Sequence, residues 1–510
     1  MKKTKIVCTL GPATDVPGRV ERLIRLGMDV ARLNFSHGTW AEHLARLDEV
    51  RKTAARVGRH IGVIQDIQGP KLRTGTPFGP LGPNGNPLPD GAVSLAAGER
   101  VVLVATEDVR EAETGDRDKD KAETMAAFAA GLSDAEMGLT VIPVGYAKLA
   151  DVLKPGATVY MDDAAVELTV LEDRPPKVVL CRVVTGGQLK AHKGVSLPGV
   201  KIELPPLTQK DRDDIALGVR HGVDFVAASF VQSASDVEEV RSLLASCGGR
   251  QRVIAKIESA AGVDNIDEII AAADAVMVAR GDLGVGIPPE DVPLVQKLII
   301  KRCNTAGKPV ITATQMLDSM ITRHRPTRAE ATDVANAIFD GTDAVMLSGE
   351  TAEGQFPEEA VDMMCRICSE TESALGYDAT LLRRRVESRT SVADAIAYAT
   401  CQTAADLKAP AIVSATQSGS TARMVAKYRP RAIILAATPD ETVARQLALS
   451  WGVVPLLVPR SHNIEHMLET VREATRESGL VPDGQTVVVT AGVRAGSPGS
   501  TNLLQVRTLA

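Results

Sequence analysis

Three short apolar segments of this chain are introduced by the same signature, and a fourth by a variant of it. A helical pattern ends, a glycine follows, and an aspartate precedes the apolar run. Gly27-Met28-Asp29, Gly222-Val223-Asp224 and Gly341-Thr342-Asp343 carry the full signature, and Ala273-Asp274 is the variant. Glycine ends a helix readily because it adopts the left-handed conformation at little cost. The repeat therefore indicates a chain assembled from similar helix–strand units.

Eight apolar runs of this kind alternate with helical patterns, near residues 5, 30, 62, 226, 255, 277, 311 and 345. Eight β/α units of this length close into a (β/α)8 TIM barrel, which places the chain in the α/β class. After the third run the pattern breaks into Gly/Pro-rich and charged stretches with short alternating runs, which indicate an inserted β-rich domain. A separate α/β unit follows the last barrel helix. We expect a barrel domain at 1–70 and 200–375, the insertion at 71–199 and a C-terminal domain at 376–510.

Bulk properties exclude several functions for these 510 residues. The net charge of −6 gives no general attraction to nucleic acid or to acidic membranes. No apolar run is long enough to span a bilayer, and the first residues do not resemble a signal peptide. Seven scattered cysteines fit a reducing cytoplasm, where we expect the protein to reside. Cys365 and Cys368 form one C-x-x-C without a second pair, so we expect no zinc site there.

Charge gathers where the predicted strands end. The run at 253–257 contains Lys256 and is followed by Glu258, and the run at 275–279 is followed by Arg280-Gly281-Asp282. A lysine inside a buried strand is costly unless it is paired or used. Other strand ends carry Arg32, Asn34, Asp66, Ser229, Thr314 and Glu350. Because barrel enzymes place their active sites at these ends, the pattern predicts an enzyme.

Glu258 and Asp282 offer two hard carboxylate ligands on neighbouring strand ends, which suits Mg²⁺. Arg32, Arg73, Lys256 and Arg280 add positive charge to the same rim. Carboxylates, a divalent cation and basic groups together indicate phosphoryl transfer, where catalysis is mainly positioning and neutralisation of charge. The alternative is a purely structural network of ion pairs that closes the top of the barrel.

A second loop of interest lies in the C-terminal unit, between an apolar run at 411–414 and a helical pattern at 422–428. Its hydroxyls and glycine are a candidate phosphate cradle at a helix N-terminus, made of Thr416, Ser418, Gly419, Ser420 and Thr421. The loop has no Walker lysine, and a simple helix-capping turn has the same composition. Both interpretations stay open at this point.

Nine segments resemble the pyruvate kinase family and follow its order along most of the chain. They are CTLGPAT (8–14), ARLNFSHG (31–38), QDIQGPKLRTG (65–75), KGVSLPG (193–199), AKIE (255–258), ARGDLGV (279–285), ATQMLDSM (313–320), the segment 325–351 and SGSTARMVAKYRP (418–430). The resemblance implies a catalytic barrel, an inserted lid and a C-terminal regulatory domain. It implies the glycolytic reaction of phosphoenolpyruvate with ADP to give pyruvate and ATP.

The resemblance also implies roles for individual residues. Glu258 and Asp282 match Mg²⁺ ligands, which also accept Mn²⁺, and Lys256 matches the lysine that neutralises the phosphoryl group. Arg32 matches a substrate-phosphate ligand, the Gly281 and Asp282 amides a carboxylate site, and Thr314 the group near the enolate carbon. Nucleotide-binding positions fall on Asn34, His37, Arg73 and Lys193. A cytoplasmic homotetramer with a sugar-phosphate or nucleotide effector at the 416–421 loop is also implied.

One position departs from the potassium-dependent members of that family. Their third-strand motif resembles DTKGPE, whereas this chain has Lys71 in place of the glutamate. Asn34, Ser36, Asp66 and Ile67 match the potassium site. An ammonium from Lys71 supplies the same unit charge from within the protein and repels a second cation. We therefore expect activity without K⁺.

Two rival functions use the same residues differently. Lys256 forms a Schiff base in a lysine-dependent aldolase, which leaves the paired carboxylates and Arg73 without a purpose. A non-catalytic sensor of phosphorylated metabolites uses the C-terminal domain alone, which leaves Lys256, Glu258 and Asp282 unexplained.

Overall fold

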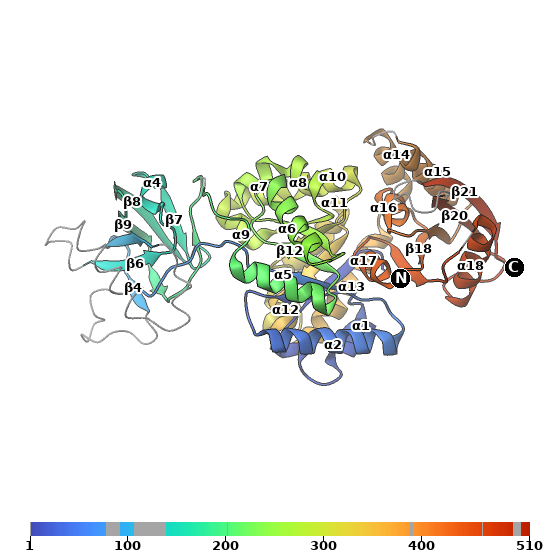
Figure 1. Cartoon of the computed structure of the whole chain (residues 1–510), viewed down its shortest axis with the longest axis horizontal. Helices are drawn as coiled ribbons and strands as arrows, with labels where there is room; N and C mark the ends of the chain where they lie inside the picture. The colour runs from blue at the N-terminus through green and yellow to red at the C-terminus, as the bar shows by residue number, and fades with distance from the viewer. Residues whose placement is uncertain are drawn as a thin grey trace.

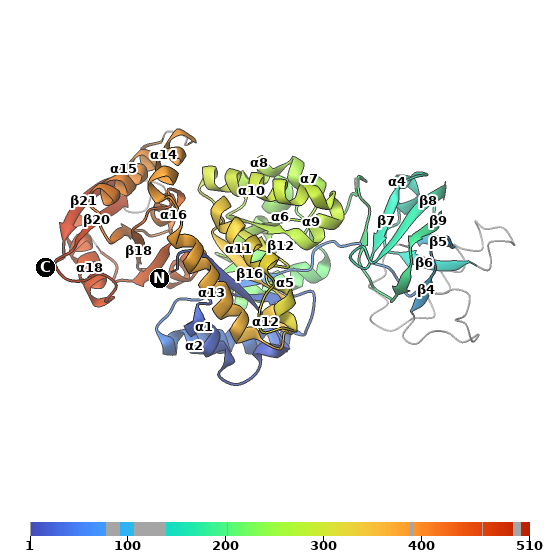
Figure 2. The same ribbon diagram turned by 180° about the vertical axis from the view of Figure 1, so that it is seen from behind.

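The computed structural model describes residues 2–77, 92–106, 139–200, 202–387, 391–461, 463–492 and 501–509. Three units follow one another along the long axis of the molecule (Figures 1 and 2). A β-rich unit lies at one end, a barrel wrapped in helices occupies the middle, and an α/β unit lies at the other end. The barrel therefore contacts the insertion with one rim and the C-terminal unit with the other.

The central sheet is the closed parallel barrel that the sequence predicts. Its strands follow one another around the barrel in the order β1-β16-β15-β14-β13-β12-β3-β2, and every pairing is parallel. They are β1 (Lys5–Leu10), β2 (Val30–Asn34), β3 (Gly62–Asp66), β12 (Phe225–Ala228), β13 (Arg252–Ile257), β14 (Ala275–Ala279), β15 (Val310–Ala313) and β16 (Ala344–Leu347). The expected fold class is confirmed, with all eight strands at the expected places.

Helices cover the outside of this barrel. They are α1 (Arg19–Leu26), α2 (Trp40–Val57), α5 (Gln209–His221), α6 (Ala234–Ser246), α7 (Ala260–Asp264), α8 (Ile266–Ala272), α10 (Val292–Ala306), α11 (Arg328–Asp340) and α13 (Pro357–Ser373). Thr39, Thr208 and Thr327 begin three of them with a reciprocal capping box, which satisfies N–H groups that the helix itself cannot. Gly222 and Gly341 then end two of them in the left-handed conformation. The glycines of the repeat thus turn each helix back toward its strand.

The aspartates of the repeat lie at the opposite end of the barrel from the polar strand ends. Each accepts a hydrogen bond from the N–H of the first or second residue of the neighbouring strand, and its own N–H donates to that residue's carbonyl. Asp29 pairs in this way with Ile6, Asp224 with Val63, Asp274 with Val253 and Asp343 with Val310. Each aspartate therefore stabilises the register of one pair of neighbouring strands. Every second strand pairing around the barrel is stabilised in this way.

The insertion forms a six-stranded sheet with the order β11-β7-β8-β9-β5-β6, beside a two-stranded ladder of β10 and β4. The strands are β4 (Val93–Leu95), β5 (Arg100–Ala105), β6 (Thr140–Val144), β7 (Thr158–Met161), β8 (Val166–Arg174), β9 (Val178–Thr185), β10 (Gly187–Leu189) and β11 (Val195–Ser196), with the short helix α4 (Leu149–Val152). The predicted β-rich character is confirmed. Most of the Gly/Pro-rich and charged stretches lies outside the described residues.

The C-terminal unit has the sheet order β19-β18-β17-β20-β21, in which only β21 runs antiparallel to its neighbour. Its strands are β17 (Ala411–Ala415), β18 (Ile433–Thr438), β19 (Val453–Leu457), β20 (Thr486–Gly492) and β21 (Thr501–Thr508). The helices are α14 (Tyr377–Glu387), α15 (Val392–Asp406), α16 (Ser420–Lys427), α17 (Glu441–Leu447) and α18 (Ile464–Glu477). The exact domain boundaries at 70, 199 and 375 stay a prediction.

Cations from several segments join the C-terminal unit to the lower end of the barrel. Arg429 Nη1 lies 2.8 Å from Asp343 Oδ1, and its guanidinium stacks on Trp451 at 4.8 Å. Arg445 Nε lies 2.8 Å from Asp224 Oδ1. From the barrel, Lys5 at the start of β1 donates a hydrogen bond to the Val453 carbonyl of the C-terminal unit at 2.7 Å. Two of the aspartates that stabilise the strand register, Asp224 and Asp343, therefore also bind the C-terminal unit.

All seven cysteines are free thiols, including Cys365 and Cys368 on α13. Burial raises the pKa of Cys8, Cys303, Cys368 and Cys401 well above the usual thiol range. These side chains therefore pack as small apolar groups. Among the described helices, none combines the length and apolar character needed to cross a membrane.

We predict that Asp343→Asn loosens the docking of the C-terminal unit. The change leaves the guanidinium of Arg429, which is only 4% exposed, without its carboxylate. Removing one partner of a buried ion pair costs about 3 kcal/mol or more. Urea denaturation followed by the fluorescence of buried Trp451 measures the loss. Asp362→Asn is the matched control, because its pair with Arg366 is exposed and contributes below about 1 kcal/mol. Equal shifts in the two variants would contradict this role of Asp343.

Candidate active site

The polar strand ends meet at the rim of the barrel that faces the β-rich insertion. Lys256 near the end of β13 is the centre of the arrangement. Its ammonium lies 2.6 Å from Ser229 Oγ, 3.0 Å from Asp66 Oδ1 and 3.1 Å from Glu258 Oε1. These partners come from the ends of β3, β12 and β13, so three consecutive barrel strands position one cation.

Burial alone would lower the pKa of Lys256, but the carboxylates of Asp66 and Glu258 outweigh it and raise that pKa. The ammonium is therefore charged although the side chain is only 10% exposed. This arrangement holds a fixed positive charge in a site from which water is largely excluded. Such a charge interacts more strongly with an anion than an exposed lysine does.

Asp66 is the shared anion of two cations. Arg32 Nε lies 2.6 Å from Asp66 Oδ2, on the side opposite to the oxygen that contacts Lys256. Burial raises the pKa of Asp66, yet Arg32 and Lys256 more than compensate and hold it below its usual value. Arg32 also donates to Thr9 Oγ1 at 3.0 Å. The guanidinium is thus oriented by two fixed groups on neighbouring strands.

The two carboxylates expected to bind metal differ in their surroundings. Glu258 is 3% exposed and accepts a 2.6 Å hydrogen bond from the Phe230 amide. Phe230 has a φ of 57°, an uncommon conformation for a bulky residue that orients this amide. Burial raises the pKa of Glu258, and the nearby Asp282 raises it further against the opposing effect of Lys256. Two carboxylates on neighbouring strand ends, one of which raises the pKa of the other, are a donor set that fits a divalent cation.

Among the described residues, no group of three or more His, Cys, Asp or Glu side chains is placed to hold a metal ion. Glu258 and Asp282 therefore offer only part of a coordination shell. Mg²⁺ suits such a site, since it commonly keeps several waters and binds one or two carboxylates together with substrate oxygens. The residues present fit this ion better than one that needs a complete protein cage.

Lys71 contacts the second of these carboxylates, which the sequence did not indicate. Its ammonium lies 2.6 Å from Asp282 Oδ1 and 3.4 Å from Asp163 Oδ1. Burial lowers the pKa of Lys71, but Asp282 outweighs it and the net shift is upward. Asp163 belongs to the insertion, so Lys71 joins the insertion to the barrel rim. Its effect therefore reaches the candidate metal ligand Asp282.

Gly281 and Asp282 lie in the first turn of α9 (Arg280–Gly286), as expected. The Gly281 amide donates to Thr314 Oγ1 at 2.8 Å. Thr314 and Gln315 have φ values of 71° and 54°, which are strained for side chains of this kind. The strain bends the chain after β15 so that the Thr314 hydroxyl meets the start of α9. Arg280, in contrast, bonds Asp333 and the Thr314 carbonyl and supports the rim.

The expected nucleotide residues are divided between the insertion and the barrel. Arg73 Nη1 donates to the His192 carbonyl at 2.9 Å, and Lys193 Nζ lies 2.8 Å from Asp162 Oδ1. Asn34 Oδ1 accepts from the Ser36 amide at 3.3 Å, and the His37 carbonyl contacts His43 Nε2 at 2.9 Å. Arg73 and Lys193 are thus held by the insertion, and Asn34 and His37 by the barrel.

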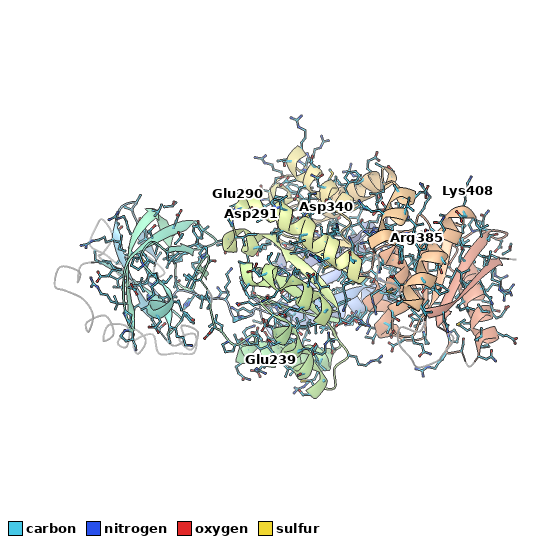
Figure 3. The ribbon with its side chains drawn as sticks, turned by 90° about the horizontal axis from the view of Figure 1, so that it is seen from above. Glu239, Glu290, Asp291, Asp340, Arg385 and Lys408 are labelled. Atoms are coloured by element: carbon cyan, nitrogen blue, oxygen red, sulfur yellow. The ribbon has the colours of Figure 1, made fainter. Side chains whose placement is uncertain are left out.

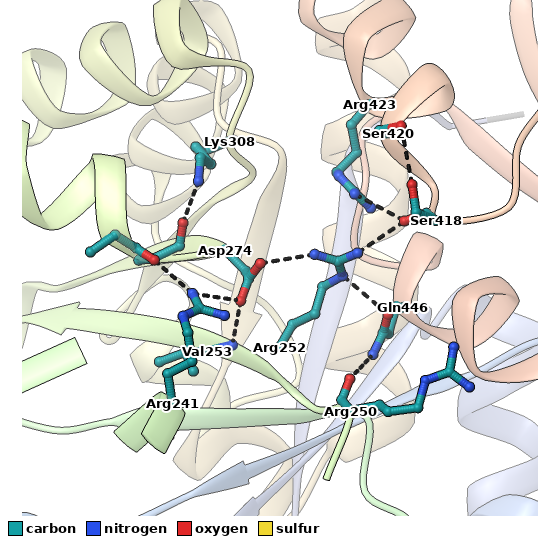
Figure 4. A network of polar contacts seen from close by, with 12 residues as sticks. Arg241, Arg250, Arg252, Val253, Asp274, Lys308, Ser418, Ser420, Arg423 and Gln446 are labelled. Atoms are coloured by element: carbon teal, nitrogen blue, oxygen red, sulfur yellow. Dashed lines mark hydrogen bonds and ion pairs between the residues drawn. The ribbon is translucent and has the colours of Figure 1, made fainter. Parts of the chain in front are cut away.

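The C-terminal loop lies at the other end of the barrel, where Figure 4 shows its polar contacts. The Ser418 carbonyl accepts from Arg252 Nη2 at 2.9 Å and from Arg423 Nη2 at 3.1 Å. Ser418 Oγ donates to Ser420 Oγ at 3.1 Å, and Thr421 Oγ1 contacts Thr501 Oγ1 at 2.9 Å. Gly419 begins α16 with a φ of 80°. The five candidate residues therefore form one turn, beside two guanidinium groups that were not predicted.

Sequence reasoning missed Ser229, the Phe230 amide and Asp163 as partners in the site. Ser229 was visible as a polar strand end, but its contact with Lys256 depends on strands that are distant in sequence. The Phe230 amide carries no signal in the residue type at all. Asp163 lies 92 positions beyond Lys71, so only the docking of the insertion reveals their contact.

Comparisons with known proteins agree with this geometry. The family described as "Pyruvate kinase, barrel domain" matches residues 1–119 and 106–361, and "Pyruvate kinase, alpha/beta domain" matches residues 394–507. A pyruvate kinase of Geobacillus stearothermophilus is 48% identical over 510 residues, which cover all of this chain and 80% of the relative. One from Sporosarcina psychrophila is 45% identical over 511 residues, with coverage of 100% and 81%.

A solved structure of a pyruvate kinase from Cryptosporidium parvum superposes with a TM-score of 0.86 at 35% identity, and the match covers 100% of this chain and 96% of that one. Both the polar rim of the barrel and the C-terminal unit fall within these matches. The chain therefore belongs to the pyruvate kinase family of phosphotransferases.

Proposed function

We propose that the upper rim of the barrel transfers the phosphoryl group of phosphoenolpyruvate to ADP with the help of Mg²⁺, giving pyruvate and ATP in glycolysis. The observation that carries the mechanism is Lys256, a charged ammonium 10% exposed between two carboxylates and a serine. A charge that is fixed and poorly solvated stabilises the phosphoryl group during transfer without first reorganising water. Membership of the family supports the same reaction.

Arg32 and Lys256 are the proposed ligands of the transferred phosphoryl group. Both are already aligned by Asp66, so little side-chain entropy is lost when an anion binds between them. We assign the carboxylate of phosphoenolpyruvate to the start of α9, where the Gly281 and Asp282 amides lie. The Gly281 amide must then exchange its bond with Thr314 for one with the substrate.

Glu258 and Asp282 are the proposed protein ligands of Mg²⁺, and Mn²⁺ is expected to substitute. When bound, the metal supplies positive charge that draws substrate oxygens toward the rim and offsets the charge that develops on them. Lys71 now contacts Asp282, so metal binding requires this ammonium to give up part of that contact. The contact between Lys71 and Asp163 gives the ammonium a second carboxylate nearby.

Thr314 is proposed to act at the enolate carbon that remains after phosphoryl transfer. Its Oγ1 accepts a hydrogen bond from the Gly281 amide, so the hydroxyl proton points to another partner. A donor in that position stabilises the enolate and orients the group that protonates it. The strained φ of 71° at Thr314 supports a functional position, because such strain persists mainly where the surroundings require it.

The insertion is proposed to act as a lid over the nucleotide. Arg73 and Lys193 would bind phosphates of ADP from the lid side, with Asn34 and His37 on the barrel side. Lys193 is paired with Asp162 and is 36% exposed, so an incoming phosphate competes with one surface carboxylate. Closing such a lid excludes water and completes the charged site.

We further propose that the reaction does not require K⁺. The residues that match a potassium site are Asn34, Ser36, Asp66 and Ile67, and Asp66 already contacts both Arg32 and Lys256. Lys71 adds a third positive charge to the rim through Asp282. A monovalent cation beside these groups adds repulsion and supplies no charge that the protein lacks.

Regulation through the C-terminal unit, within a cytoplasmic homotetramer, completes the proposal. A sugar phosphate or nucleotide would bind the turn of Thr416, Ser418, Gly419, Ser420 and Thr421 at the start of α16. Arg252 supports a coupling route, because its guanidinium donates to the Ser418 carbonyl (Figure 4). Arg252 is the first residue of β13, and Lys256 lies on the same strand. A shift of the loop therefore acts directly on the strand that carries the catalytic lysine.

The aldolase alternative fits these contacts poorly. A Schiff-base lysine attacks as a neutral amine, whereas three oxygen atoms around Lys256 stabilise the ammonium. It also leaves the paired carboxylates of Glu258 and Asp282 without a role. A sensor without catalysis leaves the strain at Thr314 unexplained.

We predict that Lys256→Met lowers turnover by at least about 10²-fold, because the variant loses a fixed charge at the phosphoryl group. A coupled lactate dehydrogenase assay measures turnover, and Mn²⁺ titration followed by electron paramagnetic resonance measures metal binding. Metal and substrate should still bind. Lys52→Met is the control, since its partner is the exposed Asp48. Unfolding or loss of Mn²⁺ binding in Lys256→Met would make the lysine a structural ion-pair partner.

The potassium proposal predicts full activity in tetramethylammonium buffer and little change when KCl is added. Lys71→Glu replaces an ammonium beside Asp282 with a further carboxylate, so this variant should become dependent on K⁺. Initial rates across a KCl titration test both statements. Lys154→Glu, which breaks an exposed pair with Asp173 in the insertion, serves as a charge-matched control. Strong activation of the parent enzyme by K⁺ would refute the idea.

For the C-terminal loop, we expect a sugar phosphate or AMP to raise the melting temperature and to change the rate at low phosphoenolpyruvate. Ser418→Glu places a carboxylate in the turn and should abolish both effects by repelling the phosphate. A thermal-shift screen paired with rate measurements makes the comparison. Ser478→Glu, at the half-buried C-cap of α18, is the matched control. Unchanged responses in Ser418→Glu would remove the loop as the effector site.

A further inference from the structure

A tight turn at residues 34–37 follows β2 and carries two of the proposed nucleotide ligands, Asn34 and His37. The His37 N–H donates to the Asn34 carbonyl at 3.3 Å, and the Phe35 N–H donates to the Asp66 carbonyl of β3 at 2.9 Å. The Asn34 side chain is half-buried and that of His37 is exposed. The turn thus extends beyond the barrel strands, and its position depends on the helices that pack against it.

His43 on α2 provides one of the contacts that fix this turn. Its Nε2 lies 2.9 Å from the His37 carbonyl, and its ring stacks on Phe35 with centroids 4.2 Å apart and planes at 22°. Trp40, from the first turn of the same helix, packs edge-on against the Phe35 ring at 4.7 Å. His43 is only 4% exposed. Two aromatic rings of α2 therefore hold Phe35, and one of them also reaches the backbone of the turn.

The protonation state of His43 follows from its surroundings. Burial lowers the pKa of His43, against the opposing effect of the His37 carbonyl, so the ring is neutral at neutral pH and carries a single N–H. A carbonyl only accepts, so this proton lies on Nε2. The buried Nδ1 has no hydrogen-bond partner among the described residues. A phenylalanine ring would stack in the same place without burying an unpaired nitrogen, so the bond to the turn is what histidine adds here.

Helix α5 holds the neighbouring carbonyl of the turn. Lys210 Nζ donates to the Phe35 carbonyl at 2.9 Å and lies 2.7 Å from Asp214 Oδ2. The other oxygen of Asp214 accepts a hydrogen bond from Trp40 Nε1 at 2.9 Å. The helices α2 and α5 thus each orient one carbonyl of the turn, and Asp214 joins the two helices.

Helix α5 is itself anchored to the barrel. Arg212 pairs with Glu239 on α6, which Figure 3 shows at the side of the barrel. Asp211 accepts a hydrogen bond at 3.1 Å from the Gly69 amide, in the segment that follows β3. Helices that are anchored elsewhere give the turn fixed attachment points, so any displacement of the turn breaks its bonds to them.

We propose that His43 is a positioning residue for nucleotide binding, which orients the turn at residues 34–37 through its hydrogen bond to the His37 carbonyl. The inference rests on the proposed function, which assigns Asn34 and His37 to the nucleotide. Because His43 is buried against Phe35, it acts through the turn and does not itself bind the nucleotide.

The effect of His43 should be confined to one substrate. The proposed ligands of phosphoenolpyruvate, Arg32 and Lys256, are oriented by Asp66 and not by the turn. Loss of the bond from His43 should therefore weaken ADP and spare phosphoenolpyruvate. A general loss of packing would instead affect both substrates together, so the two KM values distinguish positioning from a structural role.

The test compares two substitutions of His43 that keep different parts of the side chain. His43→Phe keeps a ring on Phe35 but has no donor for the turn, so KM for ADP should rise about fivefold, as expected for the loss of one hydrogen bond. His43→Gln keeps an N–H donor and should hold KM for ADP within about twofold of the parent. In both variants kcat and KM for phosphoenolpyruvate should stay within about twofold. A coupled lactate dehydrogenase assay on the full-length protein measures all three quantities.

His60→Phe is the matched control. His60 is half-buried beyond the opposite end of α2, and its charged neighbours are Glu441 and Arg445 of the C-terminal unit. This variant should leave KM for ADP within about twofold of the parent.

A second readout follows the turn without any substrate. The chain has two tryptophans, and Trp451 is only 2% exposed, so acrylamide quenching reports mainly on the half-buried Trp40 beside Phe35. Quenching should rise in His43→Phe and stay at the parent level in His60→Phe.

Removal of a turn ligand separates this inference from the proposed function. His37→Ala should raise KM for ADP by itself; if it does not, the nucleotide assignment of the turn is wrong and the positioning role of His43 falls with it. If His37→Ala raises KM for ADP and His43→Phe does not, the positioning role alone is overturned. Equal losses for both substrates, or a His43→Gln variant as impaired as His43→Phe, would make His43 a packing residue and overturn the proposal as well.

Discussion

Four carboxylates at the lower end of the barrel, three of them buried and Asp274 half-buried, support the rest of the molecule. Asp29, Asp224, Asp274 and Asp343 each join two neighbouring strands through a backbone amide. A buried carboxylate is costly unless cations and hydrogen bonds satisfy it. Asp224 and Asp343 obtain their cations partly from the C-terminal unit, through Arg445 and Arg429. The closure of the barrel and the docking of that unit are therefore one electrostatic arrangement, and neither is complete without the other.

Strand β13 connects the lower end of the barrel with the candidate active site at the upper rim. Its first residue, Arg252, contacts Asp274 and the Ser418 carbonyl, and Glu258 follows its last residue. An extended strand transmits displacement along its axis well, because its hydrogen bonds to neighbouring strands resist local bending. Lys256 is held by Asp66 and Ser229 on the adjoining strands. The geometry at the rim thus depends on strand register that is set at the opposite end.

Much of this was visible in the sequence, because the barrel strands are short apolar runs and polar residues collect only where they end. The alternation of side chains along a strand already placed Lys256 and Glu258 on one face. What escaped prediction depends on contacts between distant segments. Lys71 and Asp282 are separated by 211 positions, and the Phe230 amide reaches Glu258 through an unusual backbone conformation that no residue type announces. Strands β8 and β21 were also missed, since β8 carries several charged residues and β21 is exposed along much of its length.

The balance of charge at the upper rim supports the proposal that the insertion acts as a lid. Lys71 and Lys193 contact Asp163 and Asp162, two consecutive residues of the insertion. Both aspartates have a φ near 52°, a conformation that aspartate tolerates better than most residues. The turn therefore presents two carboxylates to the cations that phosphate groups must reach. In the proposed mechanism, phosphate groups compete with these carboxylates for Lys71 and Lys193, and Lys71 also contacts Asp282 on the barrel. We therefore expect ligand binding to change the contacts of the insertion through these two lysines.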